Sequence, residues 1–319
     1  MMEEVQNLVS VIITTCKRKP EIVQRAIKSV LAQTYSPLEI IVVDDSPSSF
    51  VQRKEIKKIV ESIPSQFNPI YITHEKNFGA CKARNTGLTH AQGEFTAYLD
   101  DDDEWMPTKI EKQVKKMKEC GSTTAMVSCN AFKVYDDGTR KIFRNNTNEK
   151  ITKNEIYKRN FIGGLSFPLI STNVLKEKNG FDEKMQSVQD TDMWIRILQK
   201  YEFGMIAEPL LFYYIHTTGQ ITSNPAKKLN GTKRLYEKNK VFYQSHKEEN
   251  YHLLLVISSF YAWNGMLGKA LSLWWNCVKI FPLKIFTNLA YALRICKRTA
   301  MYWKNRKKIC QLQKENPII

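Results

Sequence analysis

Four short apolar runs separated by amphipathic stretches occupy the first hundred residues, and this alternation restricts the fold more than any other feature. The runs at residues 8–14, 38–43, 70–72 and 94–99 have the composition of buried strands. Amphipathic helical patterns follow the first three runs, and Pro20 opens the first of them. Strands alternating with helices of this length predict an α/β fold with a doubly wound, mostly parallel sheet.

Polar side chains end three of these predicted strands. The first strand ends at Thr14 and Thr15, the second at Asp44 and Asp45, and the fourth in the four aspartates of residues 100–103. In an open parallel sheet, ligands bind beyond the carboxyl ends of the strands. We therefore expect a binding site where these three strand ends meet.

After the acidic run, the elements become less regular. A helix is followed by residues 125–134 and 139–143, which flank an Asp-Asp-Gly turn and predict a hairpin. Residues 190–201 have the apolar spacing of an amphipathic helix. Residues 204–215 predict two short strands interrupted by Pro209, because proline cannot donate to a strand ladder.

The charge of the chain is concentrated at its C-terminal end. The net charge is +16, and residues 251–319 supply +10 of it, with eleven Lys or Arg and one acid. Four of the six tryptophans also lie there, in residues 263–303. Aromatic and basic helices, expected at 267–280 and 281–295, fit an anionic membrane surface. The alternative is a helical appendage whose basic face is solvated.

These features predict two regions, a catalytic domain at 1–225 and a helical membrane-associating region at 226–319. The seven cysteines form no CxxC pair, which indicates free thiols in a reducing compartment. The N-terminus has acids and a strand-length apolar run rather than a leader, and the C-terminal apolar stretches are too polar for a convincing membrane span. We expect a cytoplasmic protein, peripheral on the inner face of the cell membrane.

The four aspartates at residues 100–103 repel one another and need a partner. Capping of the following helix explains one or two of them. A divalent cation explains more, because carboxylate oxygens suit Mg²⁺ or Mn²⁺ and such sites complete their shell with substrate phosphates. The cation would neutralise charge that develops on a departing diphosphate.

Two segments resemble family 2 glycosyltransferases with the GT-A fold. Residues 77–87 read N-F-G-A-C-K-A-R-N-T-G, and residues 93–107 read G-E-F-T-A-Y-L-D-D-D-D-E-W-M-P. The family pattern is N-x-G…A-R-N-x-G followed by G-E-aromatic…L-D-x-D-D-x-W-x-P. The strand and loop at 11–18 and the strand end at 40–46 also match, so the resemblance covers roughly residues 8–220. It implies a GT-A domain that transfers sugar from a UDP-sugar donor.

The resemblance assigns donor-side roles to residues of these motifs. Asp44 is implied to accept a hydrogen bond from uracil, Thr15 to pack near the base, and Asp100 to lie near the ribose. Arg84 is implied to contact the diphosphate, although a surface ion pair would also suit its charge. Asp102 is implied as the metal ligand. Asp45 and Asp101 belong to the same expected nucleotide-sugar site, and Cys16 stands where the family often has an aromatic residue.

The resemblance also assigns the base and a second metal ligand. Residues 189–194 read Q-D-T-D-M-W, which is similar to the family's E-D-x-x-x-W motif, so Asp190 is implied as the base and Gln189 replaces the usual Glu. Helix capping is the alternative role for Asp190 and Asp192. His216 closes a Y-x-x-H pattern and is implied to complete the metal shell, against a plain packing role.

The predicted function is inverting transfer of a hexose or N-acetylhexosamine to a saccharide acceptor, expected to be lipid-linked, in cell-surface polysaccharide biosynthesis. A sugar nucleotidyltransferase is the alternative enzyme, but the loop after the first strand lacks the glycines that such enzymes place there. A nucleic-acid-binding protein would leave the acidic run and Asp190 unexplained. A binding protein without activity should have lost Asp102 or Asp190, and both are present. We therefore expect no nucleic-acid partner.

Overall fold

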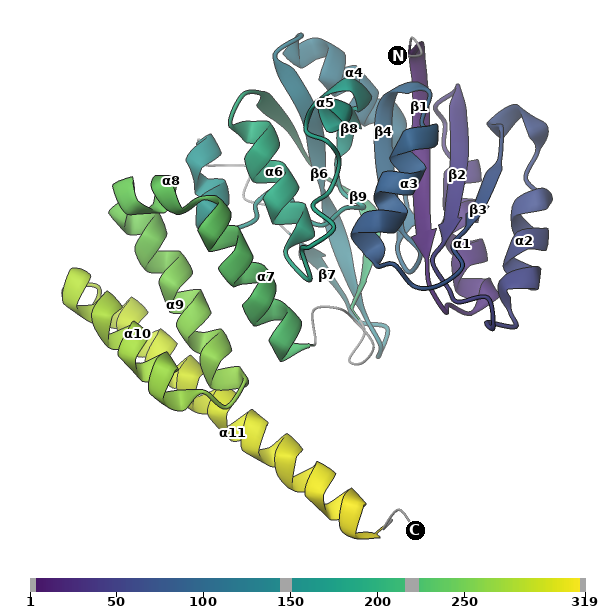
Figure 1. The fold of residues 1–319 in the computed structure, drawn as a ribbon. Coiled ribbons are helices and arrows are strands. Elements are labelled where there is room, and N and C mark those ends of the chain that lie inside the picture. The colour runs from purple at the N-terminus through teal and green to yellow at the C-terminus, as the bar shows by residue number, and fades with distance from the viewer. Residues whose placement is uncertain (1–3, 144–150, 216–223, 316–319) are drawn as a thin grey trace. The chain divides into compact units, whose positions relative to one another are not determined.

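The computed structural model describes residues 4–143, 151–215 and 224–315 (Figure 1). The chain divides into two compact units. Unit 1 comprises Met1–Lys184 and Gln189–Thr217, and unit 2 comprises Met185–Val188 and Thr218–Ile319.

Unit 1 is built on a twisted sheet whose first half is parallel. Its strands pair in the order β3-β2-β1-β4 and are β1 (Val5–Thr15), β2 (Leu38–Asp44), β3 (Ile70–Thr73) and β4 (Gly93–Asp100). Helices connect them, and the first four are α1 (Pro20–Leu31), α2 (Arg53–Glu61), α3 (Ala80–His90) and α4 (Lys109–Cys120). The alternation predicted from the sequence is confirmed, and with it the α/β class.

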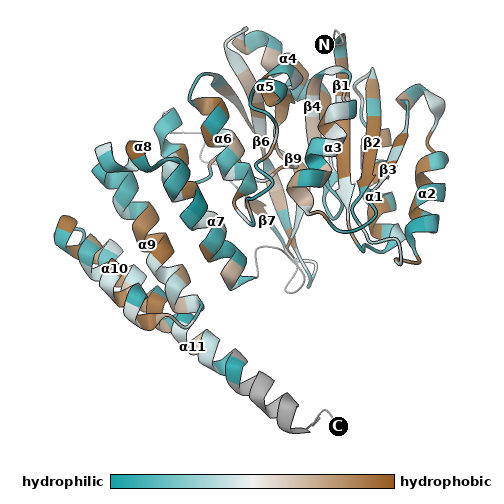
Figure 2. Cartoon of the chain, viewed as in Figure 1, coloured by the Kyte–Doolittle hydropathy of each residue, from teal (hydrophilic) through white to brown (hydrophobic). Residues whose placement is uncertain are grey.

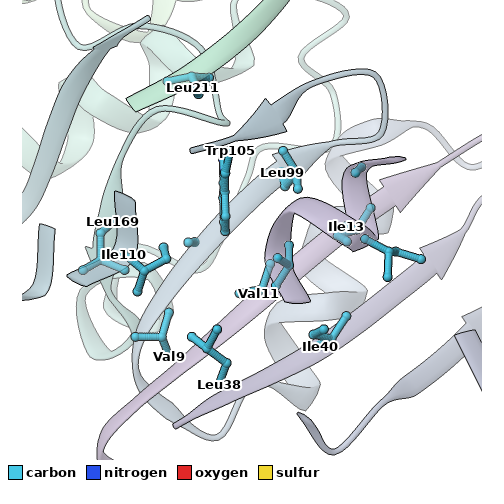
Figure 3. Packing of buried hydrophobic residues seen from close by; sticks show 14 of the residues in the cluster. Val9, Val11, Ile13, Leu38, Ile40, Leu99, Trp105, Ile110, Leu169 and Leu211 are labelled. Carbon is cyan, nitrogen blue, oxygen red and sulfur yellow. The ribbon is translucent and has the colours of Figure 1, made fainter. Parts of the chain in front are cut away.

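The main core lies on one face of this sheet. Alternate residues of β1 point into it, and the apolar faces of α1, α2 and α4 pack against them. Figure 3 shows Val9 and Val11 of β1, Leu38 and Ile40 of β2, and Trp105 in this layer. Strands that are covered on both faces need apolar residues in succession, which explains the uninterrupted apolar runs of the sequence.

Helix α3 covers the opposite face of the sheet, where Figure 1 also shows α6 (Gln189–Leu198). Gly87 of α3 lies directly against Ile12 of β1, and a side chain at this position would overlap the Ile12 side chain. The glycine that ends the A-R-N-x-G motif therefore allows the helix to approach the strand closely. This close approach places Arg84, one turn earlier, over the strand ends.

The second half of the sheet is mixed rather than parallel. β8 (Leu169–Ser171) runs antiparallel to both β4 and β6 (Thr124–Tyr135), and β6 forms the predicted hairpin with β7 (Arg140–Phe143). The remaining elements of this half are β5 (Glu104–Trp105), β9 (Glu202–Ile215), the short helix α5 (Thr172–Glu177) and the 3-10 helix at Lys153–Tyr157, and a second 3-10 helix at Ser65–Phe67 precedes β3 in the first half.

The prediction of two short strands around Pro209 was wrong. β9 is one strand parallel to β6, with extra residues between Ile206 and Pro209. The carbonyl oxygen of Ala207 in this bulge accepts from Nδ2 of Asn130 (2.6 Å). Because residues in a bulge do not pair in the regular ladder, the missing N–H of Pro209 does not end the strand.

The described secondary structure of unit 2 consists of helices. Its helices are α7 (Pro225–Lys238), α8 (Lys240–Ser245), α9 (Lys247–Trp263), α10 (Leu267–Ile280) and α11 (Ile285–Glu315). Figure 2 shows polar colour along α7 and more apolar colour on α9, which packs against α7, α10 and α11. The helix predicted at 281–295 begins later, at Ile285, and continues beyond 295 as α11. None of the described helices has an apolar stretch long enough to cross a bilayer.

Candidate active site

Parallel pairing brings the three polar strand ends together. Thr15 lies opposite Asp44 in the β1–β2 pair, and Thr14 lies opposite Asp100 in the β1–β4 pair. The backbone N–H of Asp45 donates to the carbonyl oxygen of Thr15 (2.8 Å). The strand ends that were predicted to share one edge of the sheet therefore do so.

Asp44 lies beneath this edge with a fully buried side chain. Its Oδ1 accepts from the backbone N–H of Ser46 (2.9 Å), and its Oδ2 accepts from the Tyr71 hydroxyl (2.8 Å). Arg53 Nε lies 3.3 Å from Oδ2. The carboxylate therefore holds the loop after β2 through these contacts.

Asp45 organises the loop that precedes α3. Its two oxygens accept from the backbone N–H groups of Phe78 and Gly79, both at 2.8 Å, and Nδ1 of His74 lies 2.7 Å from Oδ1. Gly79 has φ +96°, a conformation that favours glycine. The N-x-G segment is thus tied to the end of β2 through one carboxylate.

Two arginines from other elements form ion pairs with three of the four aspartates in the acidic run. Arg18, in the loop after β1, donates from Nε to Asp101 (2.9 Å) and from Nη2 to Asp102 (3.0 Å). Arg84 of α3 donates from Nη2 to Asp100 (3.0 Å). Burial raises the pKa of Asp101, and the Arg18 guanidinium opposes that rise. The repulsion expected within the run is therefore relieved by cations that the sequence places far away.

Asp103 anchors the end of the run. It is fully buried and accepts from the backbone N–H of Tyr214 (3.1 Å). Burial, and then the charges of its neighbours in the run, raise its pKa well above the ordinary value. Two residues later, Trp105 donates from Nε1 to the carbonyl oxygen of Ser166 (3.0 Å). These contacts attach the D-x-D-D-x-W segment to β9 and to the 160–167 loop.

Asp190, the predicted base, lies in the first turn of α6 and is partly exposed. Its Oδ2 accepts from Nδ2 of Asn160 (2.9 Å). Trp194 of the same helix donates from Nε1 to the carbonyl oxygen of Gly163 (3.0 Å). One loop therefore positions both the carboxylate and the helix that carries it.

Arg84 joins the two halves of the site. Besides Asp100, it donates from Nη1 to Oε1 of Gln189 (2.8 Å), the residue before Asp190. Its side chain is 7% exposed, so both bonds are shielded from water. Gln189, which replaces the Glu of the family motif, is thus an acceptor for the arginine that also holds the acidic run.

The electrostatic environment of Tyr213 in β9 includes both groups of acids. Its pKa is raised by burial and then by the charges of Asp103, Asp100, Asp190 and Asp102. The pKa of the Tyr213 hydroxyl is therefore affected by the charges of both the predicted donor-side carboxylates and the predicted base. The two groups of acids are about 90 residues apart in the sequence, and Arg84 joins their segments through its bonds to Asp100 and Gln189.

The donor set fits a hard divalent cation only in part. Asp100 and Asp102 offer carboxylate oxygens, with side chains 33% and 15% exposed. In the described ranges, no three Asp, Glu, His or Cys side chains converge to hold an ion by themselves. His216, the other predicted ligand, lies outside the described residues. A cation at this edge would take further ligands from phosphate and water, as Mg²⁺ commonly does.

Sequence reasoning missed several partners of these residues. Arg18 was visible only as part of the opening motif, and nothing in its spacing related it to Asp101. Asn160 and His74 had no motif at all. Gln189 was noted as a departure from the family pattern, without its bond to Arg84.

The sequence of the chain is similar to those of known glycosyltransferases. The profile of glycosyl transferase family 2 matches residues 10–177. WcaA of Escherichia coli K12, named as a colanic acid biosynthesis glycosyl transferase, is 32% identical over 240 residues, covering 73% of this chain and 81% of its own. WfgD of Escherichia coli, a UDP-Glc:alpha-D-GlcNAc-diphosphoundecaprenol beta-1,3-glucosyltransferase, is 31% identical over 230 residues, covering 70% and 82%.

The fold has a counterpart among solved structures. S. aureus TarS 1-349 in complex with UDP-GlcNAc superposes with a TM-score of 0.62 at 15% identity, covering 94% of this chain and 91% of that one. The family profile covers more than half of the chain, and the strand ends, the acidic run and Asp190 occupy one region of the fold. The protein is a member of glycosyl transferase family 2 and has the GT-A fold.

Proposed function

We propose that the chain transfers a sugar from a UDP-sugar to a saccharide acceptor with inversion, in the biosynthesis of a cell-surface polysaccharide. The observation that carries this proposal is the bridge that Arg84 forms between Asp100 of the acidic run and Gln189, the residue before Asp190. A donor diphosphate and an acceptor hydroxyl have to meet between groups of these two kinds. The names of WcaA and WfgD support the polysaccharide and UDP-sugar assignments.

The donor would bind along the ends of β1, β2 and β4. Thr15 and Asp45 lie at these ends, and Arg18 and Arg84 supply positive charge beside the carboxylates. A diphosphate that enters this region can take over guanidinium donors now given to Asp100–Asp102. Arginine suits that exchange because its planar donors match phosphate as well as carboxylate.

A bound Mg²⁺ or Mn²⁺ would be held by Asp102, with His216 as a second candidate, and would stabilise negative charge on the leaving diphosphate. Asp100 lies beside Asp102 and is held by Arg84, so it is placed to contact the donor. Asp103 is too deeply buried for that role and supports the run from below.

Asp190 is the proposed base. As the acceptor oxygen bonds to the anomeric carbon, the bond from that carbon to the diphosphate oxygen breaks, and UDP leaves. The acceptor proton passes to the Asp190 carboxylate. Asn160 holds one carboxylate oxygen and Trp194 fixes the helix, so the orientation of the base is set before the acceptor binds.

The proposed acceptor is a lipid-linked saccharide at the inner face of the membrane. WfgD, whose acceptor is named as a diphosphoundecaprenol-linked sugar, supports this assignment. The basic and aromatic composition of residues 251–319 supports it independently. We accordingly propose residues 1–225 as the catalytic domain and 226–319 as a membrane-associating region.

Thermal denaturation with a panel of UDP-sugars, each with and without Mn²⁺, tests the donor assignment. We expect one UDP-sugar to raise the melting temperature of the wild type in the presence of Mn²⁺ and to have no effect on Asp102→Ala. Asp137→Ala, which removes an exposed carboxylate from the β6–β7 turn, is the matched control and should respond like the wild type. No shift with any nucleotide sugar would refute the donor assignment.

A further inference from the structure

Helices α10 and α11 form a layer in unit 2 with one buried and one exposed side. Both helices pack against α9, through buried residues such as Ala270, Cys277 and Ile295. The sides that point away from α9 have no described partner among these helices. Their composition therefore indicates what they meet outside the molecule.

The exposed side of this layer is unusually apolar. In the connection between the helices, Leu283 is 91% exposed, and Phe286 in the first turn of α11 is 89% exposed. Leu293 (63% exposed) follows on the same face of α11, seven residues after Phe286, and Trp275 of α10 is half exposed. Large apolar side chains are more often buried, and several exposed ones on one layer indicate a contact surface.

A small basic cavity borders this apolar side. Its volume is about 280 Å³, and it is lined by Trp263, Arg294, Lys297, Arg298 and Met301. The four residues from α11 recur at spacings of three and four, so they share one face of the helix. That face adjoins the one carrying Leu293, because Lys297 lies one turn after it.

The cations of this cavity are not matched by acids. Among the described residues, no Asp or Glu forms an ion pair with Arg294, Lys297 or Arg298. Arg298 instead lies over the ring of Trp263, 4.9 Å from its centroid, and donates to the hydroxyl of Ser259 (2.5 Å). Burial, and next the charge of Arg294, lower the pKa of Arg298 to about 10, so it remains charged at neutral pH. Arg294 and Lys297 are exposed, so the positive charge of this cavity is accessible to an anion from solution or from a surface.

We propose that this cavity binds the phosphate of an anionic phospholipid headgroup, while Leu283, Phe286 and Leu293 enter the membrane interface beside it. The apolar residues and the cations lie on adjoining faces of one helix, as the depth profile of a bilayer surface requires. A hydrophobic partner alone would not need the unmatched cations, and a soluble anion would not need the apolar side.

This inference rests on the proposed function, which places the acceptor at the membrane. It adds which residues of the chain contact that membrane. It does not depend on the donor site. Vesicle binding without nucleotide therefore tests it separately, and failure of the donor experiment would leave the result standing.

The experiment measures sedimentation of the full chain with vesicles of phosphatidylcholine containing about 30 mol% phosphatidylglycerol, and with vesicles of phosphatidylcholine alone. We expect binding to the anionic vesicles and roughly 25-fold weaker partitioning for Arg294→Gln/Lys297→Gln, from about fivefold per cation near an anionic surface. Lys233→Gln/Lys247→Gln removes the same charge from exposed positions of α7 and α9, outside the α10–α11 layer, and its loss of partitioning should be at least fivefold smaller.

The apolar part has its own control. Leu283→Ser/Phe286→Ser should weaken partitioning at least tenfold, whereas Val241→Ser, which removes an 82% exposed apolar side chain elsewhere in unit 2, should not. All substituted positions are exposed, and an unchanged melting temperature confirms that each variant is folded.

Several results would overturn the proposal. An equal decrease in vesicle partitioning for the double variant in the cavity and for the control double variant would mean that binding is diffuse charge attraction and that there is no headgroup site. Competition by millimolar inorganic phosphate, with no preference for anionic vesicles, would assign the cavity to a free anion. If the protein does not bind vesicles but self-associates, and Phe286→Ser abolishes the self-association, the surface binds a second copy of the chain. If it does not bind vesicles but is retained on RNA, and Arg294→Gln/Lys297→Gln abolishes the retention, the surface binds nucleic acid.

Discussion

Two aspartates in the first turn of α6 should have opposite consequences when their charge is removed. Asp190 is partly exposed and bonded to Asn160, whereas the side chain of Asp192 is 2% exposed and accepts from Nε of Arg196 (3.0 Å). We expect Asp190→Asn to lose activity at almost unchanged stability. Asp192→Asn should lose stability and keep activity.

The magnitudes follow from these contacts. Removing a general base lowers turnover by about 10²–10⁴, or ~3–5 kcal/mol of transition-state stabilisation. The amide oxygen of an asparagine at position 190 can still accept from Asn160, so the cost to folding should stay below about 1 kcal/mol. At Asp192, loss of a buried charge-assisted bond costs ~2 kcal/mol. Arg196 keeps two carbonyl partners, those of Lys178 (2.6 Å) and Gly180 (2.8 Å), which limits the loss.

The assay compares UDP release from the donor selected by thermal shift with the melting temperature of each variant. For a unit of this size, ~2 kcal/mol corresponds to a decrease of about 4–8 °C for Asp192→Asn. Turnover by Asp190→Asn within threefold of the wild type would refute its role as the base. Inactive Asp192→Asn with an unchanged melting temperature would refute the assignment of that residue to structure.

Three further changes test other parts of unit 1. Arg18→Gln should raise the affinity of the protein for Mn²⁺ alone by roughly 3–10-fold, as measured by electron paramagnetic resonance titration. The reason is that Arg18 competes with the cation for Asp102, and a partly exposed ion pair of this kind is worth about 1 kcal/mol. An unchanged affinity would show that the arginine does not compete. In denaturant titrations, Gly87→Ala should lower the free energy of unfolding by about 1–3 kcal/mol, because the added methyl group overlaps Ile12. The control Gly268→Ala has open space around the added methyl group and should be neutral or slightly stabilising. Burial lowers the pKa of Lys109 from 10.5 to about 8, so the unfolded chain binds that proton more tightly between these values and stability rises with pH there. Lys109→Met should remove that rise, at most about 3 kcal/mol, and parallel stability–pH curves for the two proteins would contradict the assignment.

Most of the elements of unit 1 could be predicted because their signals are local. The apolar runs that became β1 to β4, the helix opened by Pro20 and the hairpin at the Asp-Asp-Gly turn each depend on neighbouring residues. β5 was not predicted, because two residues carry no periodicity and pair with β9 only after the chain has folded back. β9 was divided in two because the effect of Pro209 depends on a bulge that Asn130 stabilises from another strand.

The candidate site shows the same limit at the level of single bonds. Motifs identified the acidic run, Arg84 and Asp190, since their spacing within each segment is short. The pairing of Arg18 with Asp101 spans 83 positions and that of Arg84 with Gln189 spans 105. Such pairs depend on where entire loops lie, and no local pattern encodes them.

The sequence by itself determined the fold class, the chemical type of the site and the charge of the C-terminal region, because periodicity, motifs and composition are properties of the chain. Only the tertiary structure decided which cations face the acidic run, that Asp44 is enclosed by its own partners, and that α11 carries apolar and basic groups on adjoining exposed faces. The physical reason is one of range. Secondary structure follows from contacts within a few residues, whereas burial and the ~3 Å geometry of an ion pair depend on elements brought together from distant parts of the chain.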